Sequence, residues 1–281
     1  MSPTRNKPSK PASTPPILVV DIGGTHVKLK LSGQDEERRF DSGPELTPAI
    51  MVANVLDMVK DWPFQSVSMG YPGPVLHGQP LSEPHNLAAG WVGFDYAAAF
   101  GVPVKIINDA AMQALGSAEQ GKLLFLGLGT GLGSAMVLGG IVEPMELAHL
   151  PYRKHTFEDY VGLRGLKKLG KKRWRAEVLR VVELLRAALQ PDEVVLGGGN
   201  NKLMHELPAG VRLGDNANAF LGGFRLWQDD LNARMLQPKK DREPASEQVR
   251  GTAAEPLAGA NVASPPARAK KAARTPASDK P

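Results

Sequence analysis

The sequence predicts an α/β fold, and three observations support this. Apolar runs of strand length, rich in valine and isoleucine, recur along the chain; ILVVDIGG (17–24) and VKIIND (104–109) are two of them. Segments with helical signals separate these runs, and strands that alternate with helices are typical of sheets covered by helices. Three of the apolar runs also end in a glycine-rich turn.

The first part of the core is predicted to form a strand, a hairpin and a helix. Residues 17–22 read as a buried strand that enters a tight Gly-Gly turn. HVKLKLS (26–32) alternates apolar and basic residues, which predicts a half-exposed strand paired with the first. Thr47 and Pro48 predict the start of a helix, because threonine caps helices and proline favours their first position. A further strand is expected within QSVSMGYPGP (65–74).

The second part repeats this alternation. VKIIND (104–109) is a buried strand, and DAAMQALGSAEQ (109–120) is the helix that follows it. KLLFLGLGTGLGSAMVLGG (122–140) reads as two strands joined by a glycine-rich turn. DEVVLGGGNN (192–201) predicts a late strand, a glycine turn and the start of another helix.

Two helices are expected between these strands, at 156–170 and at 172–190. Thr156 and Asp159 have the spacing of a capping box at the start of the first. The segment RGLKKLGKKRWR (164–175) contains seven basic residues and no acidic one. A solvated helix face is the usual explanation of such a run, and contact with a polyanion is the alternative.

The composition fits one large domain or two small ones, since 281 residues that are 42% hydrophobic can bury a sizeable core. The net charge of +5 lies mostly in the ends of the chain: residues 1–16 carry +3, residues 237–281 carry +4, and 17–236 carry −2. We predict disordered tails at 1–16 and 237–281, which are rich in proline and lysine. The basic balance is therefore no evidence that the folded part binds nucleic acid.

Several classes of protein are excluded or disfavoured. The chain has no cysteine, which rules out disulfides and thiolate metal sites. No apolar run approaches the length of about 18 residues that a membrane helix requires. The first sixteen residues lack the apolar segment of a secretory signal. We therefore expect a cytoplasmic protein without membrane partners.

Three glycine-rich turns suggest that the chain binds phosphate. They lie at 21–25, 127–133 and 197–199, each at the end of an apolar strand. Glycine lets backbone N–H groups converge on an anion without steric clash. A single such turn is no more than a tight turn, but three in one chain are harder to explain in that way. A P-loop is excluded because Leu123 replaces its Ser or Thr, and no turn fits the dinucleotide motif GxGxxG.

Six segments, taken together and in order, resemble the ROK family of sugar kinases within the actin/hexokinase superfamily. The segments are DIGGTHVK (21–28), PHNLAAGW (84–91), IIND (106–109), GLGTGLGSAMVLGG (127–140), ELAHL (146–150) and VVLGGG (194–199). The resemblance covers about 17–236 and is strongest to the polyphosphate glucokinase-type members. It implies an actin-like (ribonuclease H-like) two-lobed fold, with an N-terminal lobe at 17–108 and a C-terminal lobe at 109–236.

The resemblance also implies a reaction: transfer of a phosphoryl group from polyphosphate or ATP to a hexose, with glucose as the expected sugar. Asp109 would be the catalytic base, because a carboxylate can accept the proton of a sugar hydroxyl as the O–P bond forms. The alternative from the sequence alone is that Asn108 or Asp109 only caps the helix that begins there. The residues expected to bind the sugar are Asn86, Asn108, Glu146 and His149.

Phosphate and magnesium ligands follow from the same resemblance. Asp21 would hold hydrated Mg²⁺, which needs only one or two carboxylates when phosphates and waters complete its shell. The expected phosphate-binding residues are Gly23, Gly24, Thr25, Gly129, Thr130, Gly131, Gly198 and Gly199.

Trp91 is expected to be a core aromatic, with stacking on the sugar as the alternative.

The sequence departs from the family in the segment after His149, where most members have three zinc-binding cysteines. We therefore predict no zinc, since His149 and His155 fall short of four ligands. Only sixteen residues precede the first strand, which leaves no room for the winged helix of the family's repressors. A homodimer is the family expectation.

Two other classes of function stay open. The first is a sugar sensor without catalytic activity on the same fold, although both Asp21 and Asp109 are present. The second is a nucleic-acid-binding protein that uses its basic tails. Those tails lack aromatic residues for stacking on bases, which disfavours the second alternative.

Overall fold

The computed structural model describes residues 15–228. Apart from Pro15 and Pro16, the two tails predicted at 1–16 and 237–281 lie outside this range. Within the described range, no helix is both long and apolar enough to cross a membrane.

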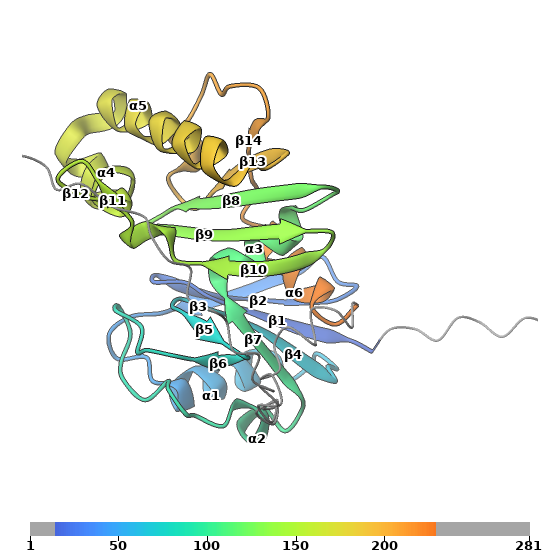
Figure 1. Ribbon diagram of the computed structural model, residues 1–281. Coiled ribbons are helices and arrows are strands. Elements are labelled where there is room, and N and C mark those ends of the chain that lie inside the picture. Colours follow the sequence, from blue (N-terminus) through green and yellow to red (C-terminus); the bar gives the residue numbers. More distant parts are fainter. Residues whose placement is uncertain (1–14, 229–281) are drawn as a thin grey trace, which may run out of the picture. The chain divides into compact units, whose positions relative to one another are not determined.

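The first sheet has five strands in the order β3-β2-β1-β4-β7 (Figure 1). Their bounds are β1 (Ile17–Ile22), β2 (His26–Leu31), β3 (Glu37–Asp41), β4 (Ser66–Tyr71) and β7 (Val104–Asn108). β1, β2 and β3 pair antiparallel, whereas β1, β4 and β7 pair parallel. The predicted hairpin of residues 17–32 is therefore confirmed.

Two helices cover one face of this sheet, α1 (Pro48–Met58) and α2 (Tyr96–Phe100). Leu18 and Val20 of β1 belong to the same buried cluster as Met51 and Val55 of α1. The predicted helix start is confirmed, because the Thr47 hydroxyl accepts the N–H of Ile50 at 3.2 Å. A short hairpin of β5 (Val75–Leu76) and β6 (Gln79–Pro80) leads from β4 toward α2.

The second sheet has the order β10-β9-β8-β13-β14. Its strands are β8 (Lys122–Leu128), β9 (Leu132–Leu138), β10 (Ile141–Met145), β13 (Glu193–Gly197) and β14 (Val211–Leu213). β8 and β9 pair antiparallel across residues 129–131, as the glycine-rich turn predicts. A 3₁₀ turn η1 (Leu147–His149) and the small hairpin β11 (Pro151–Tyr152) and β12 (His155–Thr156) follow β10.

Helices α4 (Phe157–Val161) and α5 (Leu163–Leu189) pack on one face of this sheet. The capping box is confirmed, because Thr156 and Asp159 make both of its hydrogen bonds. The single helix predicted at 156–170 is wrong: the chain breaks at Gly162, because the backbone there packs against Thr130 and Gly131. α5 itself kinks at Gly170, whose φ of 74° is left-handed and which lies at the predicted boundary between two helices.

The helix expected after the glycine turn at 197–199 is also wrong. Only a 3₁₀ turn, η2 (Asn201–Leu203), forms there. The Asn201 amide donates to the carbonyls of Leu196 and Gly214, at 3.0 and 2.8 Å. Asparagine side chains that bind nearby backbone groups compete with helix formation in this way.

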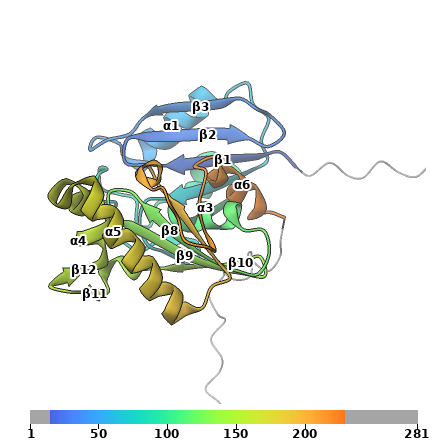
Figure 2. The ribbon, with the colours of Figure 1, turned by 90° about the horizontal axis from the view of Figure 1, so that it is seen from above.

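Two further helices lie between the sheets, α3 (Asp109–Ser117) and α6 (Asn218–Arg225) (Figures 1 and 2). One buried cluster joins Val19 of β1 with Met112 of α3, Phe125 of β8 and Phe220 of α6. Within residues 15–228 the layers are therefore helices, first sheet, α3 with α6, second sheet, and helices. The first sheet ends at Asn108 and the second starts at Lys122; the lobe boundary at 108/109 stays a prediction.

Candidate active site

The predicted base, Asp109, is the first residue of α3 and directly follows β7. Its neighbour Asn108 is the N-cap: the side-chain oxygen accepts the N–H of Ala111 at 3.1 Å, and the amide donates to the Gly73 carbonyl at 3.0 Å. Asn108 therefore has the capping role that the sequence left open between these two residues. Its amide anchors the start of α3, whereas one oxygen of the Asp109 carboxylate accepts the N–H of Ala110 at 2.7 Å.

Two other carboxylates influence the pKa of Asp109. Burial raises the pKa of Asp109 to about 7, and the negative charges of Asp21 and Glu146 act in the same direction. Burial also raises the pKa of Asp21 to about 6, although Lys28 opposes this rise. The three groups come from the end of β1, the start of α3 and the segment before η1. Acids whose pKa values are raised by burial and by neighbouring negative charges are typical of functional sites.

The first glycine turn joins β1 to β2 next to Asp21. Its backbone is held by the Gly23 N–H, which donates to the His26 carbonyl, and by the Ser42 hydroxyl, which donates to the Gly23 carbonyl at 2.7 Å. The Asn86 amide nitrogen lies 3.7 Å from the position that a Cβ of Gly24 would take. The structure therefore brings the predicted sugar residue Asn86 to the predicted phosphate turn.

The loop that carries Asn86 is closed by a residue that the sequence analysis missed. The Glu83 carboxylate accepts the N–H groups of Gly90 and Trp91, both at 3.0 Å, and that of Val92 at 3.3 Å. Trp91 is fully buried against Tyr71, with ring centroids 5.9 Å apart, so it is a core residue. Glu83 and Trp91 thus fix both ends of the loop around Asn86.

This arrangement makes Glu83 a positioning residue with a measurable effect. Glu83→Gln keeps one acceptor oxygen but loses the charge that strengthens three hydrogen bonds. We expect the KM for the sugar to rise on the order of tenfold, with kcat changed by less than about twofold. Steady-state kinetics with the sugar varied measures both values. The control is Glu45→Gln, an exposed glutamate, and an equal KM for the two variants would contradict the positioning role.

The second and third glycine turns lie against each other. A Cβ on Gly198, whose φ is +78°, would come within 2.7 Å of the Leu128 backbone. Asn200 joins the two turns: its N–H donates to the Leu128 carbonyl at 2.9 Å and its amide to the Gly129 carbonyl at 3.2 Å. Asn200 is a second residue that the sequence analysis missed, although it directly follows the third turn.

The second turn is also attached to the α4–α5 junction. The N–H of Leu163 lies 3.1 Å from the carbonyls of both Gly129 and Thr130. The Glu158 carboxylate lies 2.6 Å from where a Cβ of Gly131 would be, and 4.0 Å from Nδ1 of His149. Glu158 therefore links the predicted sugar residue His149 to the predicted phosphate turn.

Glu146 lies just before His149, at the start of η1. Partial desolvation raises its pKa, whereas His149 lowers it. The contacts form two groups. Asn86 lies at the first turn, whereas His149 is linked through Glu158 to the second turn, which Asn200 joins to the third. The negative charges of Asp21 and Glu146 both act on Asp109.

The site fits magnesium better than a metal held by protein ligands alone. The described residues contain no group of three or more His, Cys, Asp or Glu side chains arranged to hold a metal ion. Asp21 nevertheless supplies one buried carboxylate at the end of β1, next to a glycine turn. Magnesium commonly takes one or two protein carboxylates and completes its shell with phosphate oxygens and water.

Comparison with known proteins agrees with this fold. The profile of the ROK family matches residues 17–143. Polyphosphate glucokinase from Mycobacterium tuberculosis (strain H37Rv) is 25% identical over 206 residues, which cover 64% of this chain and 76% of that protein. The bifunctional enzyme NanE/NanK from Brucella melitensis is 30% identical over 149 residues, 47% of this chain but only 28% of that enzyme.

A solved structure, the inorganic polyphosphate/ATP-glucomannokinase from Arthrobacter sp. strain KM, superposes with a TM-score of 0.65 at 24% identity. The match covers 77% of this chain and all of that one. The ROK hexokinase from Thermus thermophilus gives 0.57 at 19% identity, over 74% of this chain and 96% of that one. The chain therefore has the predicted actin-like two-lobed fold, and its residues 17–143 are similar to the ROK family.

Proposed function

We propose that the protein is a sugar kinase that transfers a phosphoryl group from polyphosphate or ATP to a hexose, with glucose as the first sugar to test. The observation that carries this proposal is the buried Asp109, with a pKa raised to about 7, at the start of α3 beside Asp21. The names of the relatives, polyphosphate glucokinase and glucomannokinase, support the same reaction class.

In the proposed reaction, Asp109 accepts the proton of the sugar hydroxyl. The hydroxyl oxygen forms a bond to the terminal phosphorus of the donor as the bond from that phosphorus to the bridging oxygen breaks. The donor leaves as ADP or as a polyphosphate shortened by one unit. A base with a pKa near 7 is well matched to this step, because about half of it is ionised at neutral pH and the ionised form is a stronger base than an ordinary carboxylate.

The other predicted residues would bind and orient the two substrates. Asn86, Glu146 and His149 would bind sugar hydroxyls, whereas the capping contacts of Asn108 give it a positioning role at the same site. Backbone N–H groups would bind donor phosphates at the three glycine turns, which contain Gly23, Gly24, Thr25, Gly129, Thr130, Gly131, Gly198 and Gly199. Asp21 would hold Mg²⁺, and the ion would neutralise phosphate charge.

A panel of hexoses tested with ATP and with long-chain polyphosphate checks this proposal. We expect a sugar phosphate from at least one pair, identified by mass spectrometry, and no turnover after magnesium is removed by a chelator. Sugar binding without phosphate transfer would instead favour the sugar sensor. Retention of DNA without sugar binding would favour the nucleic-acid-binding protein.

A further inference from the structure

The start of α5 carries a concentrated positive charge that the proposed reaction does not use. We call it the basic run; its members are Arg164, Lys167, Lys168, Lys171, Lys172, Arg173 and Arg175. Residues 17–236 have a net charge of −2, so without these seven residues the rest of that segment carries −9. Seven of the 22 Lys and Arg residues of 17–236 therefore lie within twelve consecutive positions.

The basic run begins at the second glycine turn. The Leu163 N–H lies 3.1 Å from both the Gly129 and the Thr130 carbonyl, and Leu163 is the residue before Arg164. α5 then leads away from this turn, at about 1.5 Å per residue up to the kink at Gly170. A phosphate chain with one end at Gly129–Gly131 would have the basic run beside its other units.

Most of the cations have no acidic partner. Arg164 pairs with Asp159 at 2.8 Å, and Arg175 contacts His205. Within residues 15–228, no ion pair is formed by the remaining members, which are all exposed: Lys167, Lys168, Lys171, Lys172 and Arg173. A solvated helix face usually intersperses both signs, and i,i+4 acid–base pairs would stabilise it. The basic run has cations alone, which repel one another at helical spacing.

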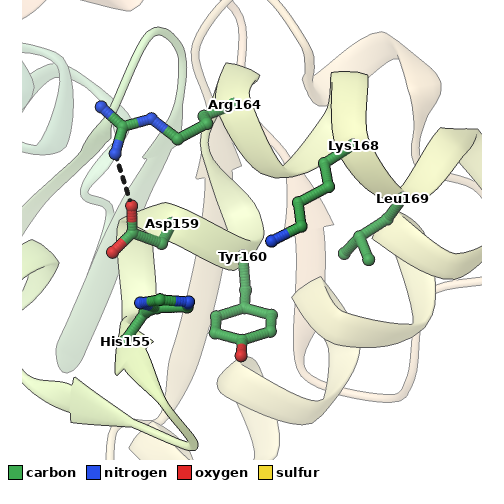
Figure 3. Close-up of a pocket in the computed structure, with 6 residues that line it drawn as sticks. All are labelled: His155, Asp159, Tyr160, Arg164, Lys168 and Leu169. Carbon is green, nitrogen blue, oxygen red and sulfur yellow. Dashed lines mark hydrogen bonds and ion pairs between the residues drawn. The ribbon is translucent and has the colours of Figure 1, made fainter.

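A hollow of 270 Å³ lies on the basic run (Figure 3). Arg164, Lys168 and Leu169 line it from α5, and His155 and Tyr160 line it from β12 and α4. The one carboxylate in its wall is Asp159, which is bound to Arg164 and to the capping hydroxyl of Thr156. Its negative charge is thus largely compensated, and Lys168 is the cation of the wall that can face an anion.

We propose that the basic run binds the distal units of a linear polyphosphate donor whose reacting end lies at Gly129–Gly131; this rests on the proposed function. ATP places three phosphates at the glycine turns, and its other end is a nucleoside without charge. Linear polyphosphate continues with a negative charge on every unit, so it alone profits from cations placed beyond the turns. The basic run therefore selects long donors over short ones.

The test uses the full chain and the variant K167Q/K168Q/K171Q/K172Q. The loss of four exposed charge contacts corresponds to a change of roughly tenfold in affinity. We expect the KM for long-chain polyphosphate to rise by about that factor and to become less dependent on salt. The KM values for ATP and for triphosphate should change by less than about twofold.

The control is R39Q/K60Q, which removes two exposed cations, one from β3 and one from the turn after α1. It is compared with K167Q/K168Q, which removes two cations from the basic run. A binding assay with fluorescent long-chain polyphosphate and no sugar separates this inference from the proposed function. Loss of binding in the four-lysine variant alone supports the basic run even if no sugar is phosphorylated. The inference is overturned if the four-lysine variant loses affinity equally for ATP and polyphosphate, or if the control loses as much affinity for polyphosphate. It is also overturned if the protein binds DNA more tightly than polyphosphate, or does not bind polyphosphate at all.

Discussion

Replacing Asp109 with asparagine is expected to lower kcat by roughly 10²–10⁴-fold while sugar binding is retained. Asparagine keeps the size of the side chain but cannot accept the hydroxyl proton. The pH profile provides an independent readout. Since the pKa of Asp109 is about 7, kcat/KM of the wild type should rise with pH through that value. This dependence should be absent from any residual activity of the variant.

The control for this experiment is Asp35→Asn, an exposed aspartate in the turn between β2 and β3. Its kcat should match the wild type. A kcat for Asp109→Asn within about threefold of the wild type would show that another group is the base.

Asp109→Asn should lower activity but raise the stability of the folded protein. Burial raises the pKa of Asp109 in the folded state, so its ionisation costs stability as pH rises from the unfolded value of about 4 to about 7. Asparagine carries no charge, so the variant should unfold at a higher temperature than the wild type at pH 8 and show a smaller difference at pH 5. Thermal unfolding at both pH values measures this. A variant that is less stable at pH 8 would mean that Asp109 is held by favourable contacts.

The largest expected effect on stability comes from Gly222→Ala at the crossing of α3 and α6. A Cβ on Gly222 would lie 1.7 Å from the Met112 carbonyl, and one on Gly116 would lie 1.8 Å from the Asn218 carbonyl. Both obstacles are backbone atoms of helices packed between two sheets, so they cannot move aside cheaply. We expect the free energy of unfolding to fall by about 2–3 kcal/mol, measured by urea denaturation.

The sign of this effect is diagnostic, because alanine is a better helix former than glycine by about 1 kcal/mol. A glycine that served only as a helix residue would be improved by the change. The control, Leu221→Ala, lies on the same helix but is 47% exposed, and its cost should stay below about 1 kcal/mol. If Gly222→Ala were neutral or stabilising, the two helices would not pack through their backbones.

The elements predicted correctly from the sequence depend on local signals. Thr47 with Pro48, and Thr156 with Asp159, start helices through contacts within one turn. The errors arose where distant residues decide. Gly162 breaks a helix because it packs on Thr130, some thirty positions earlier in the chain. No periodicity within residues 156–170 contains that information.

The candidate site could likewise be predicted only in part, because local motifs identify some of its residues and distant contacts decide the rest. The motifs placed acids and glycines in order, but they did not determine whether Asn108 or Asp109 caps α3, since adjacent polar residues give the same pattern. The structure decides this through the Gly73 carbonyl, which binds the Asn108 amide. Glu83 was missed because its partners lie seven to nine positions later, and no short motif describes a carboxylate that closes such a loop.

The position of α6 has a consequence for synthesis on the ribosome. The Ser68 hydroxyl of β4 donates to the Gly223 carbonyl at 2.6 Å, and Gly223 packs directly on Val19 of β1. The cover of this face, which α3 begins, is thus completed only after more than 220 residues have been translated. Until then part of the apolar face is exposed to solvent, where it is open to aggregation and to chaperones. The N-terminal sheet is therefore synthesised first but fully buried last. A chain that is released before α6 is made lacks part of the buried layer between the two sheets.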